Sequence, residues 1–291
     1  MNDSRAGTIF LEDAEVLDNV EHPGEQWIMR LRAPRIAAAA EPGSFMHLRC
    51  DTGLPMRRPM SVMRADRDQG WVEILFKVVG TGTRLLAGRG PGERLSALGP
   101  IGHGFEPSPE RPRALLLGGG VGIPPMIFLA DHLRADPRYR PLVLMGSEVA
   151  FPFDVRSSRI PVPGIAATTD ACLTLLDEWG VPSRLASLQG YPGCHSGFVP
   201  DLARAWIDSL DADARAEVAI FACGPTPMLR ACAELAASCE LPCQLSLEEH
   251  MACAVGGCAG CVVPVRTADG VAMRRVCVDG PVFDGATVIW G

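Results

Sequence analysis

Residues 114–125 read Ala-Leu-Leu-Leu-Gly-Gly-Gly-Val-Gly-Ile-Pro-Pro, an apolar run followed by a glycine-rich turn and two prolines. The apolar run predicts a buried strand, and the pattern from Pro124 to Arg134 predicts a helix. Backbone N–H groups at such a strand-to-helix turn suit a pyrophosphate, although similar turns also occur without a ligand and this one is not G-x-G-x-x-G. The candidate binding residues of the turn are Gly118, Gly119, Gly120 and Gly122.

The strand, turn and helix order then recurs. The segments 141–145 and 218–222 are further apolar strands, and 228–239 has the pattern of a helix. Alternation of this kind predicts a parallel α/β domain, which we assign to residues 111–243.

Two turns of this domain carry further candidate residues. Cys223-Gly224-Pro225 follows a parallel strand, at the edge where ligands of open α/β sheets gather. The alternative is that this turn only starts a helix, with Pro227 in its first turn, and binds no ligand. Glu148 follows another strand, and its charge would repel a 2′-phosphate and could bond a ribose hydroxyl. The sequence therefore favours NAD over NADP.

The first third of the chain has a different texture. Short apolar runs alternate with segments rich in Gly, Pro and Asp, and the expected strands are 26–31, 44–49, 59–63 and 71–79. This spacing predicts a small antiparallel barrel over residues 1–108.

Four cysteines close the chain with the spacing C-x4-C-x2-C-x15-C, namely Cys253, Cys258, Cys261 and Cys277. The first three match the plant-type ligand spacing of a [2Fe–2S] cluster, and small residues between them let backbone N–H groups reach the sulfurs. A structural zinc site is the alternative, but zinc usually pairs two short-spaced cysteines with two more. A cluster would also stabilise residues 244–291, which are too few to fold by burial alone.

Composition narrows the class of protein. The net charge of −7 gives no basic footprint, so nucleic acid is not an expected partner. An odd count of 11 cysteines in a chain of 291 residues fits a reducing compartment, and we expect a cytoplasmic protein. No apolar run approaches the length that crosses a bilayer, so no membrane association is expected.

Together the motifs resemble the ferredoxin–NADP reductase superfamily and, within it, the electron-transfer subunits of class 1B dihydroorotate dehydrogenases. The resemblance covers nearly the whole chain. It rests on Arg58-Pro59-Met60-Ser61, on the turn 77–83, on the barrel end 98–105, on the two glycine turns described above, and on the segments 248–253 and 276–283.

The resemblance implies FAD in the barrel, NAD as electron acceptor and a [2Fe–2S] cluster. It implies contacts to the flavin from Arg58, Pro59, Met60, Ser61, Leu75, Phe76, Lys77, Gly82 and Thr83, with Cys223 packing near the nicotinamide. The chemistry of these residues agrees, because Arg58 could bind a phosphate, and Gly82 and Thr83 could offer backbone N–H groups and the Thr83 hydroxyl to a pyrophosphate.

The resemblance also implies a partner. Electrons would come from an FMN-containing dihydroorotate dehydrogenase subunit of pyrimidine biosynthesis, in a heterotetramer of two copies of each chain. This chain would need no catalytic side chain of its own. Met251, Ala254 and Val255 would be apolar contacts to that partner.

Two alternatives stay open at this point. One is a flavin and iron–sulfur reductase component of another redox complex, although the oxygenase type has a longer final cysteine spacing. The other is a non-enzymatic scaffold with a zinc-stapled tail. The segment 171–196, which includes Trp179-Gly180-Val181-Pro182, departs from the family pattern and has no assigned role.

Overall fold

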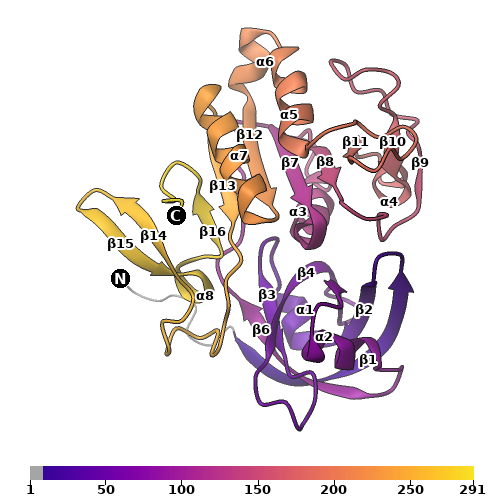
Figure 1. The fold of residues 1–291 in the computed structure, drawn as a ribbon, viewed down its shortest axis with the longest axis vertical. Coiled ribbons are helices and arrows are strands. Elements are labelled where there is room, and N and C mark those ends of the chain that lie inside the picture. Colours follow the sequence, from indigo (N-terminus) through magenta and orange to yellow (C-terminus); the bar gives the residue numbers. More distant parts are fainter. Residues whose placement is uncertain (1–8) are drawn as a thin grey trace.

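In a computed structural model, residues 9–291 are described, and the first eight residues of the expected barrel domain lie outside this range. Figure 1 shows a barrel below an α/β layer, with a hairpin and its connecting loops to one side. The expected architecture of an antiparallel barrel, a parallel α/β domain and a small C-terminal region is confirmed. None of the described helices has the length and apolar character needed to cross a membrane.

Six antiparallel strands close the barrel in the order β1-β2-β5-β4-β3-β6. They are β1 (Phe10–His22), β2 (Gln26–Arg32), β3 (Phe45–Leu48), β4 (Arg58–Asp66), β5 (Trp71–Lys77) and β6 (Arg94–Ile101), with the short helices α1 (Pro34–Ala39) and α2 (Thr81–Ala87) between them. Alternate side chains such as Met29, Leu31 and Ile74 fill the interior.

The expected strand over 71–79 is too long. β5 ends at Lys77, and the next residues turn into α2. The hydroxyl of Thr83 causes this turn, because it accepts from the backbone N–H groups of Val79 and Gly80 at 3.0 and 3.2 Å.

The α/β layer is a six-stranded sheet in the order β11-β8-β7-β12-β13-β16, parallel except for β16. Its strands are β7 (Arg113–Gly119), β8 (Leu142–Gly146), β11 (Ser183–Ala186), β12 (Val218–Cys223), β13 (Cys243–Ser246) and β16 (Val282–Asp284). Every residue of β12 is buried, as expected of a parallel strand that is covered on both faces.

Helices cover both faces of this sheet. They are α3 (Ile123–Arg134), which follows the 3₁₀ turn η1 (Gly120–Gly122), α4 (Thr174–Glu178), α5 (Val199–Asp208), α6 (Ala212–Ala216) and α7 (Thr226–Ser238). On β7, Leu115 and Leu117 pack on the side of α5 and α7, whereas Leu116 packs with α3. Helix α3 also meets barrel residues, since Met63 and Leu75 belong to its hydrophobic cluster.

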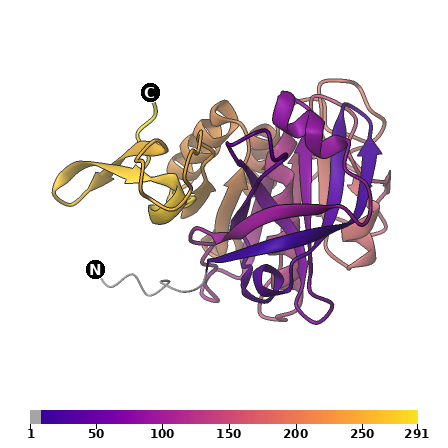
Figure 2. The ribbon, with the colours of Figure 1, turned by 90° about the horizontal axis from the view of Figure 1, so that it is seen from below.

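The C-terminal region adds the hairpin β14 (Val262–Thr267) and β15 (Gly270–Arg275), the turn of helix α8 (Val276–Asp279) and strand β16. Figure 2 shows the hairpin projecting from the body. Two short strands elsewhere, β9 (Val155–Ser157) and β10 (Ala171–Leu173), pair with each other beside α4. Because β16 pairs with β13 of the main sheet, the C-terminal region is anchored to the α/β layer.

Candidate functional site

A cavity of about 830 Å³ lies where the barrel, the sheet and the C-terminal region meet. This volume falls in the range of cofactor sites. Of the residues expected to contact a flavin, the cavity lining includes Arg58, Pro59, Met60, Ser61, Leu75, Phe76, Lys77 and Thr83. The structure therefore brings the separate barrel motifs to one wall.

Gly82 does not line the cavity but lies directly under Arg58. A Cβ at position 82 would be 2.8 Å from Arg58 Nε, so a side chain there would displace the guanidinium from this position. Arg58 Nη1 donates to the carbonyls of Met56 and Arg57 at 2.9 and 3.2 Å, which fixes the side chain and leaves its other nitrogens for a ligand. A charged fork held at a turn suits a phosphate.

Thr83 contributes differently from the expectation. Its hydroxyl already bonds the backbone of Val79 and Gly80, so it shapes the turn from within. Ser61, in β4, lines the cavity opposite Phe45 in the strand register.

The sheet supplies the facing wall. Gly224 and Pro225 line the cavity, as does Val121 of the glycine-rich turn, whereas Gly118, Gly119, Gly120, Gly122 and Cys223 do not. A Cβ at Gly122 would come within 2.3 Å of the Cys223 carbonyl oxygen, so glycine there lets the two turns touch. Gly120 has a φ of +54° and open space above it, and its turn presents backbone to the solvent.

Cys223 is fully buried at the end of β12. Burial, and then the nearby charge of Glu248, raise the pKa of its thiol, so the group stays protonated. This fits the expectation of a packing role and not a reactive one.

Glu248 is a site residue that the sequence analysis missed. Its side chain is exposed to the cavity but surrounded by protein on most sides, and this burial raises its pKa. It lies just beyond the carboxyl end of β13, the position where ligands of parallel sheets gather, and that signal could have found it. The segment Ile289–Gly291 also lines the cavity and carries no recognisable motif.

The four cysteines gather in a loop and in α8, next to this cavity. The cavity lining reaches Met251, two residues before Cys253, and resumes at Val262, directly after Cys261. Cys258 is exposed, while Cys261 and Cys277 are buried at 3% and 1% exposure. The thiols lie in two pairs, Cys253 with Cys258 and Cys261 with Cys277.

The thiol environments fit an iron–sulfur cluster. Burial disfavours the Cys253 thiolate, but N–H groups of Val255, Cys258 and Gly257 outweigh it and lower the pKa to about 7. Burial and the adjacent Cys261 thiol raise the pKa of Cys277 to about 12, a repulsion that bound metal would relieve. Gly260 N–H also points at Cys258 Sγ, at 3.4 Å. N–H donors to sulfur are typical of cluster loops.

Among the residues that the structure describes, no three ligating side chains already stand at the spacing of a single metal ion. Two pairs of thiols are instead what a cluster with two irons requires. Tight backbone curvature holds the loop, since Ala254 and Ala259 both have positive φ, at 57° and 52°.

Ala254 is buried at 1% exposure, so the expectation that it contacts a partner is wrong. Its methyl group packs into the core beneath the loop. Val255, at 49% exposure, does face outward.

The other cysteines are free thiols, and Cys50, Cys172, Cys232 and Cys243 are buried, whereas Cys194 and Cys239 are partly exposed.

Comparisons with known proteins agree with this arrangement. Residues 248–289 match the family model described as the iron–sulfur cluster binding domain of dihydroorotate dehydrogenase B. The dihydroorotate dehydrogenase B (NAD(+)) electron transfer subunit of Desulforamulus reducens is 31% identical over 282 residues, or 96% of this chain and 98% of that relative. The subunit of the same name from Bacillus caldolyticus is 36% identical over 255 residues, or 86% and 87% of the two chains.

Solved structures share the fold. The NADH-dependent reduced ferredoxin–NADP oxidoreductase, described in a study of flavin-based electron bifurcation, superposes with a TM-score of 0.74 at 23% identity, over 96% of this chain and 90% of that one. The ferredoxin reductase of carbazole 1,9a-dioxygenase gives 0.62 at 21% identity, over 80% and 67%.

Proposed function

The chain belongs to the family of dihydroorotate dehydrogenase B (NAD+) electron transfer subunits, and we propose that it passes electrons from dihydroorotate to NAD+ within pyrimidine biosynthesis. The substrate would be oxidised on a separate FMN-containing catalytic subunit. Electrons would then travel through a [2Fe–2S] cluster and FAD held by this chain.

The observation that carries the proposal is the placement of one cavity between three sets of residues. The barrel wall contains Arg58 and Ser61, the sheet wall contains Gly224, and the third wall is the segment 248–251 that leads into the cysteine loop. A flavin in this cavity would lie between the nicotinamide side and the cluster side. Such an order is what a carrier between a one-electron and a two-electron partner needs.

The residues would act by binding and orientation. Arg58 would hold a flavin phosphate over Gly82, and Phe45, Leu75 and Met60 would give the ring an apolar wall. Gly118–Gly122 and Gly224 would leave room for the dinucleotide at the carboxyl edge of the sheet. When bound, FAD and the cluster supply the exchange between hydride and single-electron transfer.

Cys253, Cys258, Cys261 and Cys277 would be the cluster ligands, two for each iron. Eleven cysteines without a disulfide among them fit a reducing compartment, and we propose that the protein is cytoplasmic. We further propose the three-part division into a flavin domain (1–108), an NAD domain (111–243) and a cluster region (244–291).

Reconstitution tests the proposal. The isolated chain is expected to oxidise NADH with artificial electron acceptors and to show no activity with dihydroorotate. Adding the FMN-containing dehydrogenase from the same source should create dihydroorotate-dependent NAD+ reduction and a complex whose mass corresponds to two copies of each chain. Reduction of NAD+ by dihydroorotate with this chain alone would refute the division of labour.

A further inference from the structure

A second cavity, of about 430 Å³, lies at the amino ends of the parallel strands, on the side of the α/β sheet away from the proposed nicotinamide site. Its lining includes Arg113 at the start of β7, Leu142 at the start of β8 and Pro182 just before β11. These are the amino ends of the parallel strands, whereas Gly224 and the glycine-rich turn lie at the carboxyl ends. Since dinucleotides bind at the carboxyl ends, this cavity is separate from the site described above.

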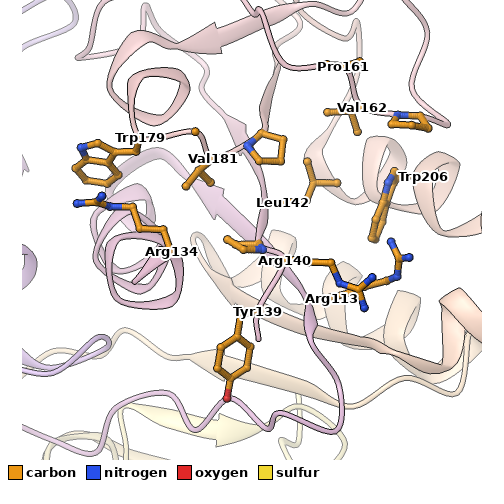
Figure 3. A pocket seen from close by; sticks show the side chains of 14 residues that line it. Arg113, Arg134, Tyr139, Arg140, Leu142, Pro161, Val162, Trp179, Val181 and Trp206 are labelled. Atoms are coloured by element: carbon orange, nitrogen blue, oxygen red, sulfur yellow. The ribbon is translucent and has the colours of Figure 1, made fainter. Parts of the chain in front are cut away.

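The segment that departs from the family pattern builds much of this cavity. Trp179-Gly180-Val181-Pro182 forms one side, and Pro161-Val162-Pro163 forms another (Figure 3). Both stretches are held in place by Asp177, which accepts hydrogen bonds from the Ser158 hydroxyl and the Arg159 backbone at 2.8 and 3.1 Å. Prolines and a buried carboxylate anchor make the wall rigid, as a preformed site requires.

The cavity is positively charged. Fourteen residues line it, and they include Arg113, Arg134 and Arg140 but no aspartate or glutamate, in a protein whose net charge is −7. Arg134 is paired with Asp131, which lies outside the lining, at 2.6 Å, so the excess charge comes from the other two arginines. Arg113 and Arg140 share one carboxylate oxygen of Glu217, at 2.9 and 2.7 Å, so the trio retains one positive charge. Within residues 9–291, the remaining N–H groups of these two guanidinium groups have no hydrogen-bond partner.

Aromatic rings complete the lining. Trp206 lies beside Arg113 and Arg140 on one side, and Trp179 lies beside Arg134 on the other (Figure 3). The Arg134 guanidinium is stacked 4.7 Å from the centre of the Trp179 ring. Leu142, Val162 and Val181 form an apolar floor between them. Flat apolar surfaces beside arginine forks are the elements that recognise a ring bearing an anionic group.

We propose that this cavity binds a small organic anion in which a flat ring carries a phosphate or a carboxylate. Arg113 and Arg140 bind the anionic group, and the ring packs on the apolar floor between the two tryptophans. The site is independent of the nicotinamide site and of the cluster.

Isothermal titration of the FAD-loaded and cluster-loaded protein tests the proposal with two probes, uridine monophosphate as the phosphate and orotate as the carboxylate. Uridine serves as the ring without a charge. At least one charged probe should bind with one site per chain and more tightly than uridine. Arg140→Ala should weaken that binding by about tenfold, because a charge-assisted hydrogen bond is lost.

The matched control is Arg138→Ala, which removes an exposed arginine two residues away that pairs with Asp136 and does not line the cavity. It should leave the affinity unchanged. A second variant, Trp206→Leu, should weaken the ring contact while flavin content shows that the protein is folded. Failure of both probes to bind, or binding that Arg140→Ala leaves intact or that Arg138→Ala weakens equally, would overturn the proposal.

Discussion

Arg58 and Gly82 show how two residues far apart in sequence are fitted to each other. The guanidinium covers the turn so closely that any Cβ at position 82 would displace it. Two backbone carbonyls hold the arginine from behind. The charge is therefore positioned before any ligand arrives, which reduces the ordering cost of binding.

Arg58→Ala is expected to weaken FAD binding by about 1.5–3 kcal/mol, because a charged hydrogen bond to phosphate is lost. Flavin fluorescence during titration of the apoprotein gives the affinity. Arg94→Ala, which removes an exposed arginine of β6 that pairs with Asp13, is the control and should bind FAD normally. Equal affinity in the Arg58 variant would show that this side chain does not hold the phosphate.

Residue types alone predicted much of the site, but not its contacts. The motif at Arg58–Ser61 and the cysteine spacing could be identified from the sequence, because each has a fixed order of residue types that is rare by chance. Glu248 was not predicted, because a single glutamate after a short strand resembles any surface acid until the fold places it beside Cys223. The hydroxyl of Thr83 was assigned to a ligand, whereas the chain uses it to start α2.

At the scale of elements, helix α4 and strand β9 are joined through one buried carboxylate. The Asp177 side chain is 1% exposed, and its Oδ2 lies 2.6 Å from Arg156 Nη2. Burial opposes its charge, but hydrogen bonds from Ser158, Arg156 and the Arg159 backbone outweigh this and lower its pKa to about 2. The ion pair stabilises the part of the chain that builds the second cavity.

Asp177→Asn should therefore lower the free energy of unfolding by about 2 kcal/mol at neutral pH. The folded pKa lies below the ordinary 3.8, so this contribution is complete above that pH and is lost as the pH falls toward 2. Urea unfolding at several pH values should show the two proteins converging in acid. The control is Asp136→Asn, which removes a carboxylate from a surface ion pair and should change the free energy of unfolding little. If the difference in unfolding free energy between wild type and Asp177→Asn stayed constant as the pH fell, the stabilising role of the Asp177 charge would be contradicted.

Some elements were predicted and others were not, for a physical reason. Strands β7 and β12 are buried on both faces, so their sequences are continuous apolar runs. β1 is partly exposed and carries five acidic residues among its thirteen, which masks its alternation. β16 has three residues and is stabilised by pairing with β13, information that lies outside its own sequence.

At the scale of the whole molecule, the cysteine loop and the barrel interior belong to separate hydrophobic clusters. Cys261 and Cys277 belong to the same buried cluster as Leu115 of the sheet and Trp206 of α5. The barrel interior, with Met29 and Val62, is a separate cluster. Loss of the iron–sulfur cluster should therefore disturb the sheet side and spare the barrel.

Cys258→Ser should abolish or strongly reduce the expected two irons and two sulfides per chain, since a thiolate ligand is lost. FAD should remain bound, and the thermal transition should move to lower temperature. Iron and sulfide assays, flavin content and calorimetry measure these outcomes. Cys239→Ser, at a partly exposed cysteine outside the loop, is the control; stoichiometric zinc without sulfide in the wild type would contradict the cluster itself.

The pairing of β16 with β13 has a practical consequence for protein engineers. A chain cut after Ser246 would leave β13 as an uncovered edge, with unpaired N–H and C=O groups of the kind that recruit other strands. The iron–sulfur segment after β13 therefore cannot be removed, or moved to another protein, as an independent unit. A graft would have to bring β16 with it and offer a host sheet whose last strand accepts an antiparallel neighbour.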